Sequence, residues 1–364
     1  MIAERLREIR ILNHYTVEDV AYRIGVTKQA VSKYETGNAI PSDDVLKKLI
    51  ELFQLPVGYL MENNNLSEEV SPLFYRRNKR TSQRELEEAR ICLKWCRELV
   101  VATKSIIDLP ALNLPSFEEG ISIEEKAKKL RTYWGILNEP ISDLPSLLQT
   151  QGIFLFSKKF QNEKIDGCSQ VIGEYPIIVL NRNKGNEARK NFSIAHELGH
   201  IILHCCKEIP DYEQIEAEAD QFAASFLLPV EGLEKEATHI NAESLQNIGD
   251  KWHVSPQAVL ERYRRLGFLG IDEERSEAKR TYLLQRLNSL KKKYIPSNNN
   301  FCNISEAIQL IDRDSIARDK FLKRVRFPVP MIRDLCQINT LFEGYEINCN
   351  DTNEIDGVQM TLAF

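Results

Sequence analysis

The chain has 364 residues, of which 43% are hydrophobic and 28% are charged, and its formal net charge is −5 at pH 7. This length suffices for two or three domains, each with its own core. No apolar run approaches the roughly 20 residues that a membrane-spanning helix needs, so we expect no membrane contact. The acidic balance excludes non-specific coating of nucleic acid, so any contact with DNA must come from a local surface.

The N-terminal segment MIAERLREIR carries charges throughout and lacks the apolar stretch of a secretory signal. The eight cysteines show no spacing typical of a metal site or of a disulfide framework. We therefore expect reduced thiols and a cytoplasmic protein.

Residues 1–61 predict a run of short helices punctuated by capping residues and glycines. VEDVAYRI follows Thr16 and ends at Gly25, and KQAVSKYE follows Thr27 and ends near Gly37. Two helices joined by a tight turn of this kind predict a helix-turn-helix. The second of them presents four polar side chains outward, which are candidates for contacts with bases and phosphates: Lys28, Gln29, Ser32 and Lys33.

The stretch from RLREIR through YTVEDVAYRIGVTKQAVSKYETGNAIPSDDVLKKLIELFQL resembles the Xre/lambda-repressor-like DNA-binding domains along its whole length. The resemblance implies an all-α domain at 1–61 whose third helix enters the major groove of double-stranded DNA. Val17 departs from that family, which often has a glutamine at this position that helps to anchor the DNA backbone. Valine offers no hydrogen-bond donor to a phosphate. Residues 1–61 carry eight Lys/Arg and eight Asp/Glu. We therefore expect weak binding by one copy and a homodimer on a DNA operator.

Residues 62–121 are expected to connect two domains. ENNNLSEEVSP (62–72) is polar and aperiodic, which indicates a linker. FYRRNKR (74–80) is expected to lead into a helix rather than to contact DNA. Amphipathic helices are predicted over 82–107 and 122–136.

The segment NFSIAHELGHIILHCC contains the HExxH pattern, formed by His196, Glu197 and His200. Helical residues four apart lie on one face, so two imidazoles at this spacing can bind one Zn²⁺. The glutamate beside the first histidine can take a proton from a water molecule that the ion activates. His204 lies too far along the same helix to be the third ligand.

The third ligand is expected in EQIEAEADQFAASFLLP, an alanine-rich helix that can pack closely on its neighbour. Glu216 and Asp220 share one face of this helix, so one carboxylate can bind zinc while the other accepts a hydrogen bond from a ligating histidine. Glu218 projects from another side and is the alternative ligand. GIFLFS and YPIIVLN, before the HExxH pattern, predict buried strands. Zinc peptidases hold a peptide along a sheet edge in this architecture.

Together, DGCSQVIGEYPIIVLNRNKGNEARKNFSIAHELGHIILH and EAEADQFAASFLLP are similar to the ImmA/IrrE family of zinc peptidases. The resemblance implies an α+β zincin-like domain of the gluzincin type with a small sheet, at residues 122–270. It implies His196, His200 and Glu216 as zinc ligands and Glu197 as the catalytic base. It also implies a bacterial or phage task, the cleavage of a repressor to release gene expression under stress.

The remaining sequence carries weaker signals. IGDKWHVSPQAVLERYRRLGFLG (248–270) is similar to the helix-turn-helix segment, and we expect it to pack within the peptidase domain. The C-terminal region, 271–364, is predicted to be helical to about residue 325 and irregular from RFPVPMI onward. The sequence indicates no role for this region.

We therefore predict a multidomain DNA-binding transcriptional regulator with a zinc-dependent endopeptidase domain. Its substrate is expected to be a protein partner, either a repressor or a toxin, or the chain itself, in the control of stress, phage or mobile-element genes. The alternative is a repressor or antitoxin that uses the zinc fold as a sensor or partner scaffold without turnover. The intact HExxH pattern favours the enzyme, because a scaffold has no need of Glu197 beside the ligands.

Overall fold

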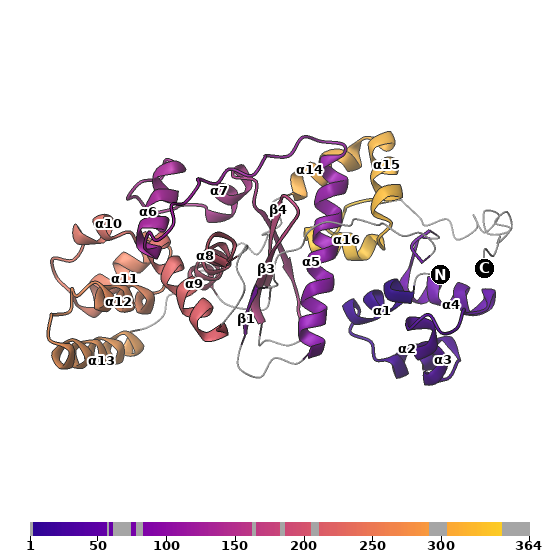
Figure 1. Ribbon diagram of the computed structural model, residues 1–364, viewed down its shortest axis with the longest axis horizontal. Helices are drawn as coiled ribbons and strands as arrows, with labels where there is room; N and C mark the ends of the chain where they lie inside the picture. Colours follow the sequence, from indigo (N-terminus) through magenta and orange to yellow (C-terminus); the bar gives the residue numbers. More distant parts are fainter. Residues whose placement is uncertain are drawn as a thin grey trace. The chain divides into compact units, whose positions relative to one another are not determined.

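A computed structural model describes the following residues of the chain: 3–56, 58–60, 74–77, 83–161, 165–182, 186–204, 211–290 and 304–343. The chain forms two compact units. Figure 1 shows their helices and strands. Unit 1 consists of Met1–Glu68, Ser82–Leu109 and Ile304–Phe364, and unit 2 consists of Glu69–Thr81 and Pro110–Asn303. Of the helices in the described residues, none combines the length and the hydropathy that crossing a bilayer requires.

The described part of unit 1 is helical, with these bounds: α1 (Ala3–Leu12), α2 (Val17–Ile24), α3 (Lys28–Glu35), α4 (Asp43–Phe53), α5 (Gln83–Lys104), α14 (Ser305–Arg313), α15 (Ser315–Val325) and α16 (Val329–Cys336). The predicted caps of α2 and α3 are confirmed, because the hydroxyls of Thr16 and Thr27 accept backbone hydrogen bonds there. Gly25 ends α2 with a φ of 73°, a conformation that glycine adopts readily. Local sequence thus sets the helix-turn-helix.

A buried ion pair joins the first and third helices of this motif. Arg10 Nε lies 2.6 Å from Glu35 Oε1, and Arg10 Nη2 lies 2.8 Å from Glu35 Oε2. The two side chains are only 10% and 6% exposed. Removing one partner would leave a buried charge uncompensated. The pair therefore holds α3 at a fixed position against α1.

The C-terminal helices complete the core of unit 1 around α5. Trp95 of α5 is fully buried, and its ring stacks on Phe327 with the centroids 4.1 Å apart. The edge of Tyr59, which follows α4, contacts the same indole. Trp95 Nε1 donates a hydrogen bond to Glu8 of α1 at 3.3 Å. Three separate stretches of the chain thus share one core.

Unit 2 is an α+β unit, as the sequence predicts. Its described elements have these bounds: β1 (Phe74–Arg77), α6 (Ile123–Tyr133), α7 (Leu144–Thr150), β2 (Phe154–Lys158), β3 (Ile165–Ile172), β4 (Tyr175–Asn181), α8 (Glu187–His204), α9 (Tyr212–Leu227), α10 (Val230–Glu234), α11 (Ala242–Lys251), α12 (Pro256–Arg265) and α13 (Glu273–Ser289). The strand order is β1-β3-β4-β2. β2 is parallel to β4, whereas β3 is antiparallel to both β4 and β1.

Helix α8 packs on β3 and β4, and α9 packs on α8 (Figure 1). Gly199 permits this approach, because a Cβ atom there would lie 3.2 Å from the Phe222 ring and 3.3 Å from the Ala219 backbone. Helices α11 and α12 contribute Leu245 and Val259 to the same core. The segment that resembles a second helix-turn-helix therefore packs within unit 2.

The structure differs from the sequence expectations in two elements. Within FYRRNKR, Phe74–Arg77 is not the start of a helix but pairs with β3 as strand β1, and residues 78–80 lie outside the described residues. RFPVPMI is not irregular, because α16 begins at Val329 with a proline in its first turn, where the missing N–H costs no helical hydrogen bond. The polar linker predicted at 62–72 lies outside the described residues.

The compact units also divide the chain differently from the predicted linear boundaries. The helix predicted as a connector belongs to unit 1 as α5, and so do residues 304–364 of the C-terminal region. Cysteines in the described residues are free thiols, as expected: Cys92, Cys96, Cys168 and Cys336. The other cysteines lie outside these residues.

Candidate functional site

The exposed face of α3 carries the four polar residues proposed to contact DNA. All four are exposed: Lys28, Gln29, Ser32 and Lys33. Val31, between them, is fully buried and fixes the rotation of the helix. Lys28 forms an exposed ion pair with Glu18 of α2 at 3.4 Å, a contact that is weak in water and leaves the lysine available to a phosphate.

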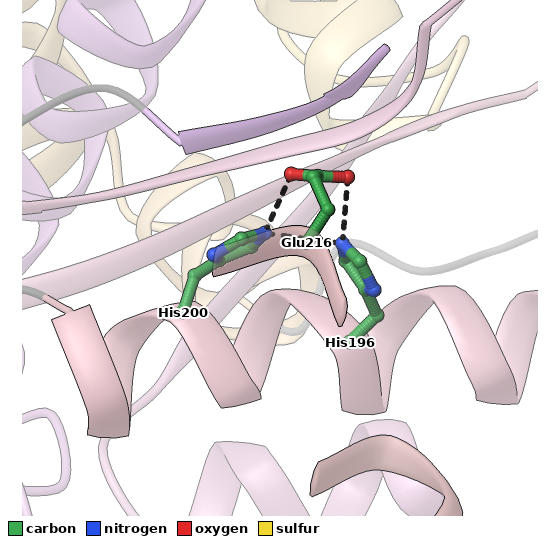
Figure 2. Close-up of side chains that lie close together, drawn as sticks. All are labelled: His196, His200 and Glu216. Atoms are coloured by element: carbon green, nitrogen blue, oxygen red, sulfur yellow. Dashed lines mark hydrogen bonds and ion pairs between the residues drawn. The ribbon is translucent and has the colours of Figure 1, made fainter. Parts of the chain in front are cut away.

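Unit 2 brings two histidines and a glutamate together between α8 and α9 (Figure 2). His196 and His200 are one turn apart on α8, and their Nε2 atoms lie 3.0 Å from each other. Glu216 of α9 places Oε2 3.6 Å from His196 Nε2 and Oε1 3.2 Å from His200 Nε2. The histidine rings are fully buried, and the carboxylate is 20% exposed. In the described residues these three form a group that could hold a metal ion.

The spacing of these atoms fits a tetrahedral zinc ion. Ligands bound at 2.0–2.1 Å to one such ion lie about 3.3 Å from each other, close to the 3.0, 3.2 and 3.6 Å found here. Glu216 Oε1 is buried and makes no hydrogen bond, although His200 lies beside it. A cation among the three side chains would satisfy this oxygen. Two histidines and a carboxylate are also a common ligand set of catalytic zinc.

Hydrogen bonds behind the rings orient both histidines. Asp220 Oδ1 lies 2.8 Å from His196 Nδ1. A carboxylate only accepts hydrogen bonds, so Nδ1 is the donor, and when the ring is neutral Nε2 carries the lone pair that a metal needs. Asp220 therefore lies behind His196, on the side of the ring that faces away from the cluster.

A chain of two hydrogen bonds, from His200 through His204 to Glu218, orients the His200 ring. Glu218 Oε2 lies 3.0 Å from His204 Nε2, and His204 Nδ1 lies 3.1 Å from His200 Nδ1. Because Glu218 accepts from His204 Nε2, a neutral His204 must accept at Nδ1 from His200. His200 Nε2 then carries the lone pair and faces Glu216. Glu218, the alternative ligand, thus contacts His204 rather than the cluster.

The charges in the cluster follow from burial and contact. Burial lowers the pKa of His196, but its contacts with Asp220 and Glu216 outweigh burial and raise the pKa to about 9. Burial raises the pKa of Glu216, but the two histidines outweigh it and lower the pKa to about 2. For His200, burial dominates and lowers the pKa. The carboxylate is therefore ionised and attracts positive charge to the cluster.

Glu197 lies between α8 and strand β3. The Ser169 hydroxyl donates a hydrogen bond to Glu197 Oε2 at 2.6 Å. A Cβ atom on Gly167 would lie 3.2 Å from Glu197 Oε1, so the missing side chain leaves room for the carboxylate. Glu197 is buried and next to His196 in sequence. The side chain expected to be the base is thus held by the sheet and lies beside the cluster.

Sequence reasoning did not find three of these contributors. It excluded His204 as a ligand, but the same four-residue spacing places this side chain directly behind His200. Ser169 and Gly167 are small residues in a buried strand, and nothing in the local sequence marks them. Only the packing of α8 on β3 shows their role.

Two family models match the chain. One, described as Helix-turn-helix, covers residues 6–60, and the other, described as IrrE N-terminal-like domain, covers residues 148–264. The HTH-type transcriptional regulator YobD of Bacillus subtilis (strain 168) is 31% identical over 78 residues, which cover 21% of this chain and 67% of that protein. The chain belongs to the HTH-type transcriptional regulators. This regulator also carries a metallopeptidase-like domain of the IrrE N-terminal type, which contains the cluster and Glu197.

One solved structure aligns with nearly the whole regulator. It is Bacillus thuringiensis PlcR in complex with the peptide PapR7 and DNA, and the alignment covers 97% of this chain and 87% of that chain. The identity is 12% and the TM-score is 0.16. A likeness this slight does not indicate a shared fold.

Proposed function

We propose that this regulator is a zinc-dependent endopeptidase that cuts a protein partner and so changes the transcription of the genes it binds. The observation that carries the proposal is the convergence of His196, His200 and Glu216 beside a buried Glu197. A scaffold could use the three ligands alone. The fourth residue, held by Ser169 beside them, is the group that hydrolysis requires.

Each residue of the site has a separate task in this reaction. His196, His200 and Glu216 would hold Zn²⁺, which supplies Lewis acidity to a peptide carbonyl and to water. Glu197 accepts the proton of the attacking water and then delivers it to the leaving amine. Ser169 fixes the direction of the Glu197 carboxylate through its hydrogen bond. Asp220 and His204 hold the two imidazole rings by their Nδ1 atoms.

The DNA-binding part of the proposal rests on α3. A homodimer would place two copies of this helix in successive major grooves of a short palindromic operator, with half-sites about one helical turn apart. Gln29 is suited to pair with adenine, and Lys28 and Lys33 can reach guanine or phosphate. A footprint on the promoter upstream of the regulator's own gene tests this geometry.

The substitution Glu197→Gln tests the enzymatic proposal. It keeps the size of the side chain and its contact with Ser169 but removes the proton acceptor. We expect unchanged zinc content and operator binding, and a loss of cleavage of about 10²–10⁴-fold. The measurement is mass spectrometry of new peptide ends after the zinc-loaded chain is incubated with a proteome-derived peptide library. Glu213→Gln, an exposed acid on α9, is the matched control.

Two results would contradict the proposal. If Glu197→Gln cuts as fast as the parent chain, Glu197 is not the base. If the parent chain holds stoichiometric zinc, cuts neither the library nor itself, and still regulates its promoter, the zinc fold is a sensor or partner scaffold.

A further inference from the structure

The sheet of unit 2 contains a strand that does not come from the metallopeptidase-like domain. The family match over residues 148–264 supplies β2, β3 and β4. The fourth strand, β1, is formed by Phe74–Arg77, between the helix-turn-helix region and α5. It pairs antiparallel with β3 and covers the outer edge of that strand (Figure 1).

The pairing lies directly beside the proposed active site. Phe74 is opposite Ser169 and Tyr75 is opposite Cys168. Neighbouring strands are about 4.8 Å apart, so the backbone of Phe74 is one strand spacing from the residue that holds Glu197. β1 also lies against α8, and it is the violet strand in Figure 2.

An extended peptide could use the same edge. Without β1, strand β3 would present a row of unpaired backbone N–H and C=O groups, which accept an added strand. The opposite edge of the sheet is β2, which β4 separates from β3. Of the two edges in the described sheet, only that of β3 brings a peptide next to Ser169 and Glu197.

We propose that Phe74–Arg77 is an internal competitor of the substrate, because it occupies the outer edge of β3, where the extended segment of a peptide substrate would lie. The inference rests on the proposed function and adds a built-in restraint to it. β1 is short, and its register shifts between Tyr75 and Arg77. A strand with four residues and a break in its ladder pairs weakly. A longer substrate segment can therefore displace it.

The test compares two double variants in the full chain, each combined with Glu197→Gln so that no probe is cut. Phe74→Pro/Tyr75→Pro removes two backbone N–H donors, of which one faces β3 in a regular strand. Phe74→Ala/Tyr75→Ala removes the same side chains but keeps both donors, and it is the matched control. The probe is a fluorescent peptide with the sequence of residues 69–81, EVSPLFYRRNKRT.

We expect the proline variant to bind the probe about tenfold more tightly than the parent, the effect of removing about one hydrogen bond from the competitor. Its Cys168 and Ser169 amides should exchange hydrogen faster than in the parent, and the added probe should restore their protection. The alanine variant should stay closer to the parent in both measurements.

Three results would overturn the inference. The first is equal probe binding by the parent and the proline variant, and the second is unchanged hydrogen exchange in β3. The third is cutting within residues 69–81 of the chain that keeps Glu197, which would make this segment a substrate. These readouts do not depend on hydrolysis. If the chain cuts peptides while β3 exchange is unchanged, the proposed function stands and the competitor does not. If binding and exchange respond as expected in a chain that cuts nothing, the docking edge stands and the enzymatic proposal does not.

Discussion

The two units differ in how many stretches of the chain build each of them. Most of the metallopeptidase-like unit is one continuous stretch, and its residues from 148 to 264 match a single family model. The DNA-binding unit is assembled from three stretches, and the last of them follows the whole of the other unit in sequence. A motif in the sequence therefore locates the chemistry of each unit, but it does not show where the unit ends.

The largest expected effect tests whether the C-terminal stretch is part of the DNA-binding unit. Phe327→Ala removes the ring that stacks on Trp95. We expect unit 1 to lose about 3–5 kcal/mol of stability, because a buried aromatic side chain leaves a cavity. Urea unfolding followed by tryptophan fluorescence measures the loss, and operator binding should weaken with it.

Zinc content should not change in this variant, because the cluster lies wholly in unit 2. Ile316→Ala, in the same C-terminal stretch but 81% exposed, is the control and should change stability by less than about 0.5 kcal/mol. A stability loss of the same size in both variants would show that the stacking of Phe327 on Trp95 is not what ties the C-terminal stretch to unit 1.

The next effect concerns the exposed face of α3. Replacing Gln29 and Ser32 by alanine should weaken operator binding by roughly 1–3 kcal/mol for each side chain that pairs well with a base. Binding to a non-specific duplex should stay the same, because phosphate contacts carry that affinity. Titration of the operator and of a scrambled duplex at one salt concentration separates the two. Equal operator affinity before and after the replacement would exclude these residues from the recognition surface.

A smaller effect is expected behind the proposed metal ligands. Glu216→Ala should remove most of the bound zinc, whereas Glu218→Ala should weaken zinc binding by about 10–100-fold, or roughly 1.4–2.7 kcal/mol. The reason is that Glu218 acts on the cluster only through His204. Competition with a chelator measures both affinities, with Glu213→Ala as the control. Full zinc in the Glu216 variant and none in the Glu218 variant would reverse the ligand assignment.

The smallest expected effect is the loss of one helix cap, and it should destabilise both units by the same amount. Thr27 caps α3 of unit 1 and Ser122 caps α6 of unit 2, each by accepting a backbone hydrogen bond. Replacing either by alanine should cost about 1 kcal/mol. Thermal unfolding of the two variants measures these losses. A much larger loss at Thr27 would show that α3 depends on more than its local cap.

The sequence predicted features whose causes lie within a few residues. The caps at Thr16 and Thr27 and the grouping of His196 with His200 follow from short, fixed spacings. The helical face that Glu216 shares with Asp220 pointed to this pair, the family resemblance selected Glu216, and the structure brings it to the same cluster. Strands β2 and β4 and helices α8 and α9 were predicted from their local patterns, but β3, which lies between the two strands in sequence, was not.

Features that depend on distant partners were not predicted. β1 contains two arginines and no alternation of apolar and polar residues, so only its pairing with β3 makes it a strand. The prolines before and within α16 suggested an irregular segment, but they stand where a helix tolerates them. The burial of Trp95 against Phe327 joins residues that no local pattern connects.

Because Phe327 stacks on Trp95, the core of the DNA-binding unit cannot be completed during translation until the C-terminal stretch has been made. The ribosome completes α5 first and must then make residues 110–303 before α14 to α16 emerge. At 5–20 residues per second this takes about 10 to 40 s. During that time Trp95 can contact Tyr59 and Glu8, which are already made, but lacks the ring of Phe327. A chain interrupted before residue 304 therefore carries α3 but lacks the helices α14 to α16 that complete the core around α5.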